Sequence, residues 1–378
     1  MAETWEIEQA RRLAALASAA ADETERDRKP PHRLLEAMAD SGLFAMAIPR
    51  SLGGRESDAP MILRALEEVS RADGSAGWCL MIAATTGVTY GFWPQSVGRA
   101  VYAANPHAVT CGVYHPRGEV RRVDGGYRVR GRWSFASACE IADWMCCGAI
   151  LADDGNPRVC DVLFPASEMK IIDTWTVSGL RGTGSHDVEL ADTFVPEERV
   201  SFRTPNRVRE PGPLYAFPLL GLLAVGVTAV AIGVARRAID ELRVLAIAKT
   251  PTGGRRRLAD RGVLQTEVAQ AEACVRSARA YLYEAVEQAH ETAGREGEMS
   301  VELRTNLRLA ATNATWSAVR ATDLMYTAGG GTSNYAASPL QRCFRDVHAI
   351  TQHAAVAPPT WELCGRFLLG LDADTTTL

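Results

Sequence analysis

The feature that most restricts the fold of this sequence is a run of 20 residues without a charge, AFPLLGLLAVGVTAVAIGVA, at positions 216–235. A run of this length could cross a lipid bilayer. It could equally form a helix that is buried on every side, in a large helical core or at an oligomer interface. The run is rich in glycine and alanine, contains one proline and is followed by Arg236, Arg237 and an amphipathic continuation. These features favour the buried helix over the membrane span.

The overall composition limits the classes of partner. The chain has 378 residues, of which 47% are hydrophobic, so it has room for a large core or for two to three domains. Its formal net charge is −4 and it has no long basic block. Neither a nucleic acid nor an anionic membrane surface is therefore indicated as a partner.

The cysteines and the first residues bear on metal binding and location. The nine cysteines include no pair with CxxC spacing and no repeated Cys/His cluster, so no metal site is predicted. An odd number of cysteines in a long chain favours free thiols and the reducing cytoplasm. The first 20 residues, MAETWEIEQARRLAALASAA, begin acidic and their apolar stretch is broken by charges, which is not typical of a signal peptide.

The first block of the chain has helical periodicity and predicts a helical domain over residues 1–105. Residues 5–24 and 32–43 are expected to be helices. In DAPMILRALEEVSRADG, Asp58 is placed to cap a helix and Pro60 suits its first turn. The nearly uncharged stretch GSAGWCLMIAATTGVTYGFW predicts a further, buried helix.

The pattern changes to short strands at about residue 107 and back to helices at about residue 213. The stretch VRRVDGGYRVRG predicts a β-hairpin, and further short strand candidates suggest an antiparallel barrel or sandwich over 106–212. Over 213–378 the expected helices suit a bundle; they are 216–248, 262–291, 300–328, 339–356 and 359–370. The predicted class is therefore α+β, in the order helices, strands, helices.

Two glycine-rich stretches are candidates for ligand contact. GLRGTGSHDV at 179–188 lies between strand-like runs and is not GxGxxG, so a dinucleotide or nucleotide phosphate loop is rejected. A turn is favoured there, although Thr183 and the glycines would also let the backbone approach a ligand. In TAGGGTSNYAASPLQR at 327–342, the three glycines fit a helix terminator and a phosphate cradle equally well.

Two further stretches carry aromatic, hydroxyl and imidazole groups. GRWSFASACEIADW at 131–144 fits an aromatic core strand better than a wall for a flat heterocycle. In RDVHAITQH at 345–353, a continuous helix would place His348 and His353 about 140° apart around its axis. The two imidazoles would then not share a metal, so at most one faces a site. A structural role is the ordinary expectation for a single helical histidine.

Three of these stretches, with the helix–strand–helix order, carry a resemblance that covers most of the chain. VDGGYRVRGRWSFASACEIADW, SGLRGTGSHDVELADTFVPEERV and SPLQRCFRDVHAITQH resemble the acyl-CoA dehydrogenase fold. More narrowly, they resemble its flavin-dependent monooxygenase branch, the two-component hydroxylases of phenols and steroid catabolites. The resemblance implies an N-terminal helical domain, a middle antiparallel β-barrel and a C-terminal four-helix bundle, usually in a homotetramer. Flavin would bind between barrel and bundle, with a neighbouring subunit contributing.

The residue at position 353 separates the two main alternatives within this fold. The dehydrogenases carry a glutamate base soon after an Arg-Asp pair, but here the stretch AITQHAAVAPPTWE has no acidic residue before Glu362. The monooxygenase branch has a histidine in this region, and His353 matches it. The resemblance therefore favours a monooxygenase over an acyl-CoA or acyl-carrier-protein dehydrogenase-type FAD oxidoreductase. A catalytically silent flavin-binding or scaffold protein is the third possibility.

The resemblance also assigns roles to individual residues. Reduced flavin and O2 would form a C4a-hydroperoxide, which requires exclusion of water and control of proton transfer. His353 would hydrogen-bond the peroxide or manage its proton, and Ser137 would lie near flavin N5, where it can hold the adduct. The residues that match flavin-contacting positions are Trp78, Gly112, Phe135, Ala136, Ser137, Gly331, Thr332, His353 and Ala354.

Departures from the family leave the substrate open. Phenol hydroxylases of the branch often carry a substrate histidine where this chain has Thr86, so His115 is a candidate replacement. Arg261 is the nearest counterpart of a flavin-holding arginine, and FMN and FAD are not distinguished. The chain has no NAD(P)H-binding fingerprint, which implies a separate NAD(P)H:flavin reductase as partner. The expected substrate is a small aromatic, polyketide-like or amine compound.

Overall fold

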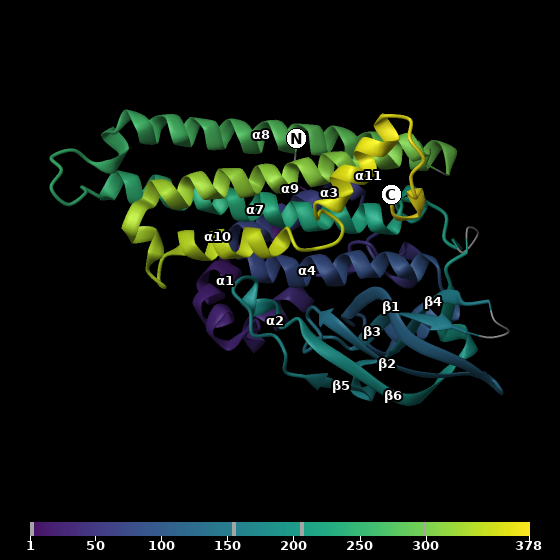
Figure 1. The fold of residues 1–378 in the computed structure, drawn as a ribbon. Coiled ribbons are helices and arrows are strands. Elements are labelled where there is room, and N and C mark those ends of the chain that lie inside the picture. The colour runs from purple at the N-terminus through teal and green to yellow at the C-terminus, as the bar shows by residue number, and fades with distance from the viewer. Residues whose placement is uncertain (1–3, 153–155, 205–207, 298) are drawn as a thin grey trace.

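The computed structural model describes residues 4–152, 156–204, 208–297 and 299–378. Figure 1 shows long helices lying side by side above a β-sheet, with α4 running between the two layers. The chain belongs to the predicted α+β class, with helices before and after the strands. The interface between the helical layer and the sheet brings the candidate site residues together.

The first block contains five α-helices. They are α1 (Trp5–Asp27), α2 (His32–Asp40), α3 (Ala59–Ala72), α4 (Gly74–Thr86) and α5 (Gln95–Ala104). Asp58 precedes α3, but its side chain makes no capping hydrogen bond, which corrects the expectation from sequence. Its carboxylate lies instead 3.3 Å from Nε2 of His290. Asp73 caps α4 by accepting a 2.8 Å hydrogen bond from the backbone N–H of Ala76.

The strands form one seven-stranded sheet in the order β5-β6-β2-β1-β3-β4-β7. They are β1 (Thr110–Val123), β2 (Gly126–Ala136), β3 (Trp144–Leu151), β4 (Arg158–Pro165), β5 (Met169–Ile172), β6 (His186–Pro196) and β7 (Val200–Phe202). The predicted hairpin joins β1 to β2, and its turn uses Gly125 at φ +75°. The pair β1–β3 is parallel, so the sheet is mixed and not wholly antiparallel.

The last block contains the helices that build the bundle. They are α6 (Pro213–Ala216), α7 (Leu219–Ala248), α8 (Gly262–Glu296), α9 (Val301–Gly329), α10 (Pro339–Ile350) and α11 (Pro359–Leu368). Helix α7 is long and apolar enough to cross a membrane by length and composition, but 83% of its most apolar window is buried. It packs against α3, α4, α9 and α10. The charge-free run therefore forms a core helix, as its glycine and alanine content indicates.

Helix α10 is shorter than the predicted helix over 339–356. It ends at Ile350, and a series of turns leads to α11. Nδ1 of His353 accepts a hydrogen bond from the N–H of Ala355, which removes a donor that a continuing helix would need. The carbonyls of Ala355 and Val356 accept hydrogen bonds from Arg308 and Trp316 on α9. His348 and His353 therefore do not lie on one continuous helix, which corrects the expectation from sequence.

The three blocks share one hydrophobic core. Leu66, Val129 and Val230 come from the first, second and third blocks and belong to the same buried cluster. The change from helix to strand falls between Ala104 and Thr110, and the change back falls between Phe202 and Pro213. The division into domains at 105/106 and 212/213 stays a prediction.

Candidate active site

Helix α4 and the end of β2 meet through one buried hydrogen bond. Nε1 of Trp78 donates to Oγ of Ser137 over 3.0 Å. All side chains of α4 are buried, because the helix is covered by the bundle on one side and by the sheet on the other. This burial explains why its sequence lacks the polar face of a surface helix.

The backbone turns sharply at the end of β2. Phe135 and Ala138 have φ values of +63° and +60°, which side-chain-bearing residues seldom adopt. Within this turn the N–H of Ser137 donates to the carbonyl of Phe135 over 2.9 Å. Ser137 is buried, whereas Phe135 is 71% exposed. Local strain of this kind often marks a functional site, and here the strained turn carries an exposed aromatic ring and a buried hydroxyl group.

Ser137 begins a chain of buried hydroxyl groups. Its Oγ lies 2.7 Å from Oγ of Ser185, which lies 2.6 Å from Oγ1 of Thr183. Oγ1 of Thr183 donates to the carbonyl of Leu180 over 2.9 Å. The glycine-rich stretch 179–188 thus serves the candidate site through its hydroxyl groups.

The same stretch packs against α10. The N–H of Leu180 donates to Oδ1 of Asp346 over 2.6 Å. A Cβ atom on Gly179 would lie 2.1 Å from the carbonyl oxygen of Arg345, so this position requires glycine for close approach. The pKa of Asp346 is raised to about 7, first because the carboxyl is buried and also because Asp73 is close. The turn interpretation of this stretch fits η5 (Arg181–Thr183), a short 3₁₀ helix.

The ring of His353 also contacts Trp78. The centroids of the two rings are 5.7 Å apart, with the planes at 68°. Because Nδ1 accepts from the N–H of Ala355 over 3.2 Å, we assign the hydrogen of the neutral ring to Nε2. The pKa of His353 is lowered to about 4, first by loss of hydration and second by the positive charge of Arg308. His353 is therefore a neutral hydrogen-bond donor at pH 7.

Arg308 is a buried cation from α9 that sequence reasoning did not select. Its Nη2 donates to the carbonyl of Ala355 over 3.0 Å, which fixes the turn that carries His353. Burial lowers the pKa of its guanidinium. Arg308 therefore fixes the backbone turn that carries His353, and its positive charge helps to keep the imidazole neutral.

The two candidate substrate residues lie in different environments. Thr86 is buried at the end of α4, whereas His115 is exposed on β1. A Cβ atom on Gly112 would lie 3.2 Å from Oγ1 of Thr86 and 3.1 Å from the ring of Tyr114. The buried hydroxyl of Tyr114 makes no hydrogen bond of ordinary geometry, and burial raises its pKa. Tyr114 therefore places a buried hydroxyl in the same neighbourhood as Thr86, and the substrate roles of Thr86 and His115 stay predictions.

Gly331 and Thr332 lie apart from the other predicted flavin residues. They belong to η8 (Gly330–Asn334), before the start of α10, whereas His353 follows its end. Twelve helical residues separate the two places by about 18 Å. A Cβ atom on Gly330 or Gly331 would meet nothing within 4 Å, and Nζ of Lys249 lies 2.6 Å from Oγ1 of Thr332. An open glycine backbone beside a cation suits a phosphate group.

The two histidines of RDVHAITQH serve different places. Nε2 of His348 lies 2.9 Å from a carboxylate oxygen of Asp323, and both side chains are more than 40% exposed. His353 alone of the two lies next to Trp78. Among the described residues no group of three or more His, Cys, Asp or Glu side chains could hold a metal ion.

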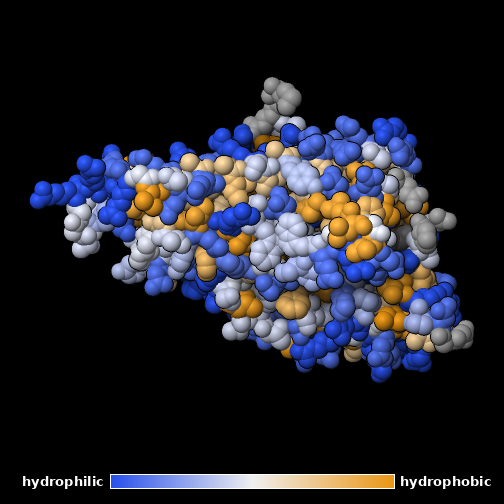
Figure 2. All heavy atoms as spheres, turned by 45° about the horizontal axis from the view of Figure 1, so that its top comes forward, coloured by the Kyte–Doolittle hydropathy of each residue, from blue (hydrophilic) through white to orange (hydrophobic). Residues whose placement is uncertain are grey.

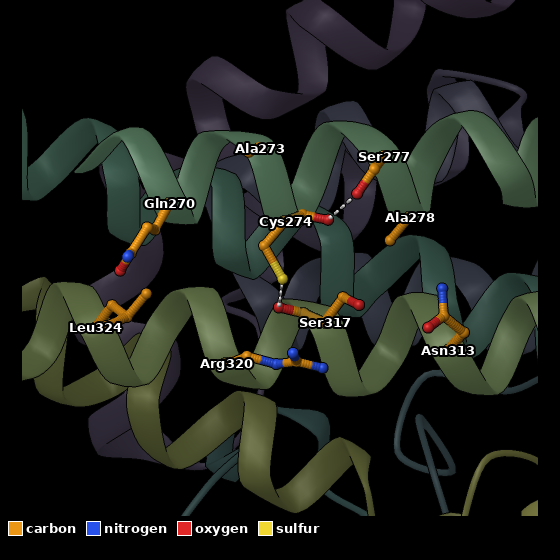
Figure 3. A pocket seen from close by; sticks show the side chains of 9 residues that line it. All are labelled: Gln270, Ala273, Cys274, Ser277, Ala278, Asn313, Ser317, Arg320 and Leu324. Carbon is orange, nitrogen blue, oxygen red and sulfur yellow. Dashed lines mark hydrogen bonds between the residues drawn. The ribbon is translucent and has the colours of Figure 1, made fainter. Parts of the chain in front are cut away.

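A groove of about 790 Å³ lies elsewhere, between α8 and α9. Figure 3 shows its floor, where Sγ of Cys274 lies 3.5 Å from the carbonyl of Ser317 and where Arg320 extends along α9. It is lined by Gln270, Ala273, Cys274, Ser277, Ala278, Asn313, Ser317, Arg320 and Leu324. None of the predicted site residues lines it, so the groove is separate from the candidate site.

The structure thus brings together several of the residues predicted to form the site. Trp78 contacts both Ser137 and His353, and Phe135, Ala136 and Ala354 adjoin these residues along the chain. Sequence reasoning missed Ser185 and Tyr114. Ser185 stands only two residues after Thr183, and across Gly184, which has φ +51°, the two hydroxyl oxygens lie 2.6 Å apart. No local pattern identified Tyr114.

Two family models match the chain. The acyl-CoA dehydrogenase N-terminal domain matches residues 7–92, and the acyl-CoA dehydrogenase C-terminal domain matches residues 225–358. Together these segments cover more than half of the 378 residues.

Curated relatives are similar over nearly the whole chain. An indole-3-acetate monooxygenase from Pseudomonas putida is 32% identical, over 92% of this chain and 89% of that protein. The oxygenase component of an FADH(2)-dependent resorcinol hydroxylase from Rhizobium sp. is 32% identical, over 95% and 93%. The oxygenase subunit of a flavin-dependent monooxygenase from Rhodococcus jostii is 30% identical, over 89% and 91%.

Solved structures agree with these relatives. The crystal structure of 3-HSA hydroxylase from Rhodococcus sp. RHA1 superimposes with a TM-score of 0.92 at 27% identity, covering 100% of this chain and 99% of that one. A monooxygenase from M. tuberculosis gives a TM-score of 0.89 at 26% identity, covering 98% and 99%. The chain therefore belongs to the acyl-CoA dehydrogenase family, in its branch of flavin-dependent monooxygenase oxygenase components.

Proposed function

We propose that this chain uses reduced flavin, delivered by a separate NAD(P)H:flavin reductase, to transfer one oxygen atom of O2 to a small aromatic substrate. The relatives named above include monooxygenases of indole-3-acetate and resorcinol, both of which are aromatic compounds. The observation in this chain that carries the proposal is the contact of Trp78 with both Ser137 and His353. This contact places the hydroxyl of Ser137 and the imidazole of His353 beside the ring of Trp78. The dehydrogenases of this fold use a carboxylate in the region of His353.

The residues of this site fit a flavin ring. Trp78 and Phe135 supply aromatic surface, and the strained turn at Phe135 leaves that ring exposed. Ser137 and His353 supply two polar groups beside Trp78. Reduced flavin, when bound, supplies the electrons that activate O2.

His353 would hold a proton at Nε2 beside the reacting centre. Its low pKa keeps the ring neutral, so the ring donates a hydrogen bond and does not act as a strong acid. Arg308 disfavours a second positive charge on that ring. The buried surroundings of Trp78 and Ser137 exclude water from this side of the site.

The substrate would lie against the end of α4 and the start of β1. Gly112, Thr86 and Tyr114 are neighbours there, and the Tyr114 hydroxyl is buried without an ordinary hydrogen-bond partner. A buried hydroxyl without a partner is stabilised when a ligand accepts or donates a hydrogen bond to it. The arrangement suits an aromatic ring that bears one polar substituent.

The glycine turn at Gly331 and Thr332 is proposed to bind the flavin phosphate of a neighbouring chain in a homotetramer. The glycine turn lies about 18 Å from His353 along α10, at the opposite end of this helix, so the two ends would contact different parts of bound flavin. Figure 2 shows apolar patches on the face that carries α8, α9 and α11, and Leu368 and Leu369 at the end of α11 are largely exposed. Contiguous apolar surface of this kind is typical of protein contacts. Light scattering should give four times the mass of one chain.

The cytoplasm is the proposed location of the protein. The nine cysteines of the chain are all free, and eight of them are buried. Free, buried thiols are typical of proteins from reducing compartments.

Incorporation of isotopic oxygen tests the proposed reaction. The purified protein, a flavin reductase, FMN or FAD and a panel of small phenols and indoles are incubated under ¹⁸O2, and products are analysed by mass spectrometry. We expect one ¹⁸O atom in the product of at least one aromatic compound. His353→Ala should release hydrogen peroxide in place of product, whereas the exposed control His32→Ala should match the wild type.

Two results would contradict the proposal. One is the absence of ¹⁸O product across the panel, and the other is bleaching of bound oxidised FAD by an acyl thioester, which a dehydrogenase would show. Glu362, the first acidic residue after Asp346, is exposed on α11, so no carboxylate replaces His353 from that segment.

A further inference from the structure

The hydroxyl chain Ser137–Ser185–Thr183 has a defined start and a defined end. At one end Trp78 can only donate, and it donates to Ser137. At the other end the carbonyl of Leu180 can only accept, and it accepts from Thr183. The three hydroxyl groups between these ends are all buried.

These ends determine which hydroxyl donates to which. Thr183 uses its hydrogen for Leu180, so its oxygen must accept the hydrogen of Ser185 across the 2.6 Å contact. The oxygen of Ser185 must then accept the hydrogen of Ser137 across 2.7 Å. Ser137 is left with no hydrogen for a ligand and with one free lone pair, since its other lone pair accepts from Trp78. It faces the site as a hydrogen-bond acceptor.

The reversed direction is unfavourable for the protein. Thr183 would have to turn its hydrogen towards Ser185 and place a lone pair 2.9 Å from the carbonyl oxygen of Leu180. That carbonyl does not move away readily, because it also accepts from Nε1 of Trp175 and from the N–H of Thr183. The N–H of Leu180 is also fixed, because it donates a hydrogen bond to Asp346. Reversal therefore loses one buried hydrogen bond and adds a repulsion.

We propose that Thr183 and Ser185 make the site selective for reduced over oxidised flavin by holding Ser137 as an acceptor. This inference rests on the proposed function, in which Ser137 lies near flavin N5. Reduced flavin carries a hydrogen on N5 and can donate to Ser137, whereas oxidised flavin presents a lone pair there. The oxidised form can pair with Ser137 only if the whole chain of hydroxyl groups reverses. Thr183 and Ser185 act through Ser137 and are positioning residues.

Anaerobic binding measurements test this selectivity without turnover. Dissociation constants of the full-length protein are measured for FMN and FAD in both redox states, for wild type, Thr183→Val and Ser185→Ala. The wild type should bind the reduced form more tightly. In Thr183→Val, Ser185 loses its acceptor and is free to donate to Ser137. In Ser185→Ala, the hydrogen of Ser137 is free to point into the site.

In each of these variants, the dissociation constant of oxidised flavin divided by that of reduced flavin should fall about five- to tenfold. This is the effect of one ordinary hydrogen bond. By linkage, this change lowers the two-electron potential of bound flavin by roughly 20–30 mV. Thr183→Ser keeps the hydroxyl and should retain the wild-type ratio. Thr322→Val is the matched control, because Thr322 is a buried threonine whose hydroxyl bonds to Ala318 within α9. If Thr183→Val does not fold, Ser185→Ala gives the result alone.

Ser137→Ala separates failure of this inference from failure of the proposed function. If Ser137→Ala changes the ratio while Thr183→Val and Ser185→Ala keep the wild-type ratio, the selectivity inference is overturned and the placement of Ser137 stands. If Ser137→Ala changes neither dissociation constant, or if the wild type binds no flavin, the placement of the flavin is wrong. A wild-type ratio near one also overturns the inference.

Discussion

The carboxylate of Asp346 accepts a 2.6 Å hydrogen bond from the backbone N–H of Leu180. Through this bond α10 holds the loop that contains Leu180. The carbonyl of Leu180 in turn accepts the hydrogen bond of the Thr183 hydroxyl group. The loop is 166 residues away from Asp346 along the chain. A helix of the bundle therefore positions the hydroxyl groups behind the candidate site.

Asp346→Asn should make the protein more resistant to neutral and alkaline pH. The folded-state pKa of Asp346 is about 7, against 3.8 for an unburied aspartate. The folded state therefore holds a proton that the unfolded state has lost, and stability falls as pH rises from about 4 to about 7. Asparagine cannot ionise but keeps an oxygen for Leu180. The variant should gain roughly 1–3 kcal/mol over wild type between pH 5 and pH 8.

Urea denaturation at both pH values measures this gain. The exposed Asp124→Asn, in the β1–β2 turn, is the control and should parallel the wild type. A variant that is less stable than wild type at pH 8 but equal at pH 5 would show that Asp346 acts as a stabilising anion.

His353→Asn should remove a loss of stability in mild acid. The pKa of His353 is about 4 in the folded state and 6.5 when unburied, so only the unfolded state takes up a proton between these values. Wild-type stability therefore falls as pH is lowered from about 6.5 to about 4. Between pH 7 and pH 5 the wild type should lose roughly 1–2 kcal/mol more than His353→Asn.

Denaturation curves at pH 5, 6 and 7 provide this comparison. His32→Asn, at an exposed histidine of α2, should follow the wild type. Equal slopes for wild type and His353→Asn would mean that His353 titrates as an exposed histidine does.

The sequence predicted the helices and strands well where the pattern is local. The charge-free run 216–235 lies within α7, and the Asp-Gly turn forms the β1–β2 hairpin. The end of α10 was missed because contacts from Arg308 and Trp316 on α9 capture the backbone after Ile350. The parallel β1–β3 pair was also missed. Both features depend on contacts between distant segments, which periodicity does not encode.

The candidate site likewise combines residues that could be identified from the sequence with contacts between distant segments that could not. Resemblance to a family identified Trp78, Ser137 and His353, which the structure brings into contact. Ser185 lies 48 residues from Ser137, and no local spacing predicts their contact. Composition also could not distinguish the half-buried Tyr114, whose hydroxyl is buried, from the exposed His115 beside it.

Trp78→Phe should increase the loss of reducing equivalents to hydrogen peroxide severalfold. Phenylalanine keeps an aromatic ring near His353 but removes the N–H that donates to Ser137. The Ser137 oxygen then lacks a partner that orients it, at a cost to stability of about 1 kcal/mol. The measurement is the ratio of peroxide to product, together with the urea midpoint.

Trp93→Phe is a matched control for this change. Trp93 is as deeply buried as Trp78, but its Nε1 has no hydrogen-bond partner. The two substitutions remove the same atoms, and only one of them breaks a hydrogen bond. If Trp93→Phe raises the peroxide ratio as much as Trp78→Phe does, loss of packing explains the effect and the bond to Ser137 does not.

Tyr114→Phe should weaken substrate binding without weakening flavin binding. The Tyr114 hydroxyl is buried beside Thr86 and lacks an ordinary hydrogen bond, so its removal should leave the protein as stable or more stable. Tyr215→Phe removes another buried hydroxyl without a partner and provides the match for stability. If Tyr114 bonds to the aromatic substrate, the substrate dissociation constant should rise about five- to tenfold, while the reduced-flavin constant stays unchanged. Equal substrate affinity in Tyr114→Phe and wild type would remove Tyr114 from the substrate site.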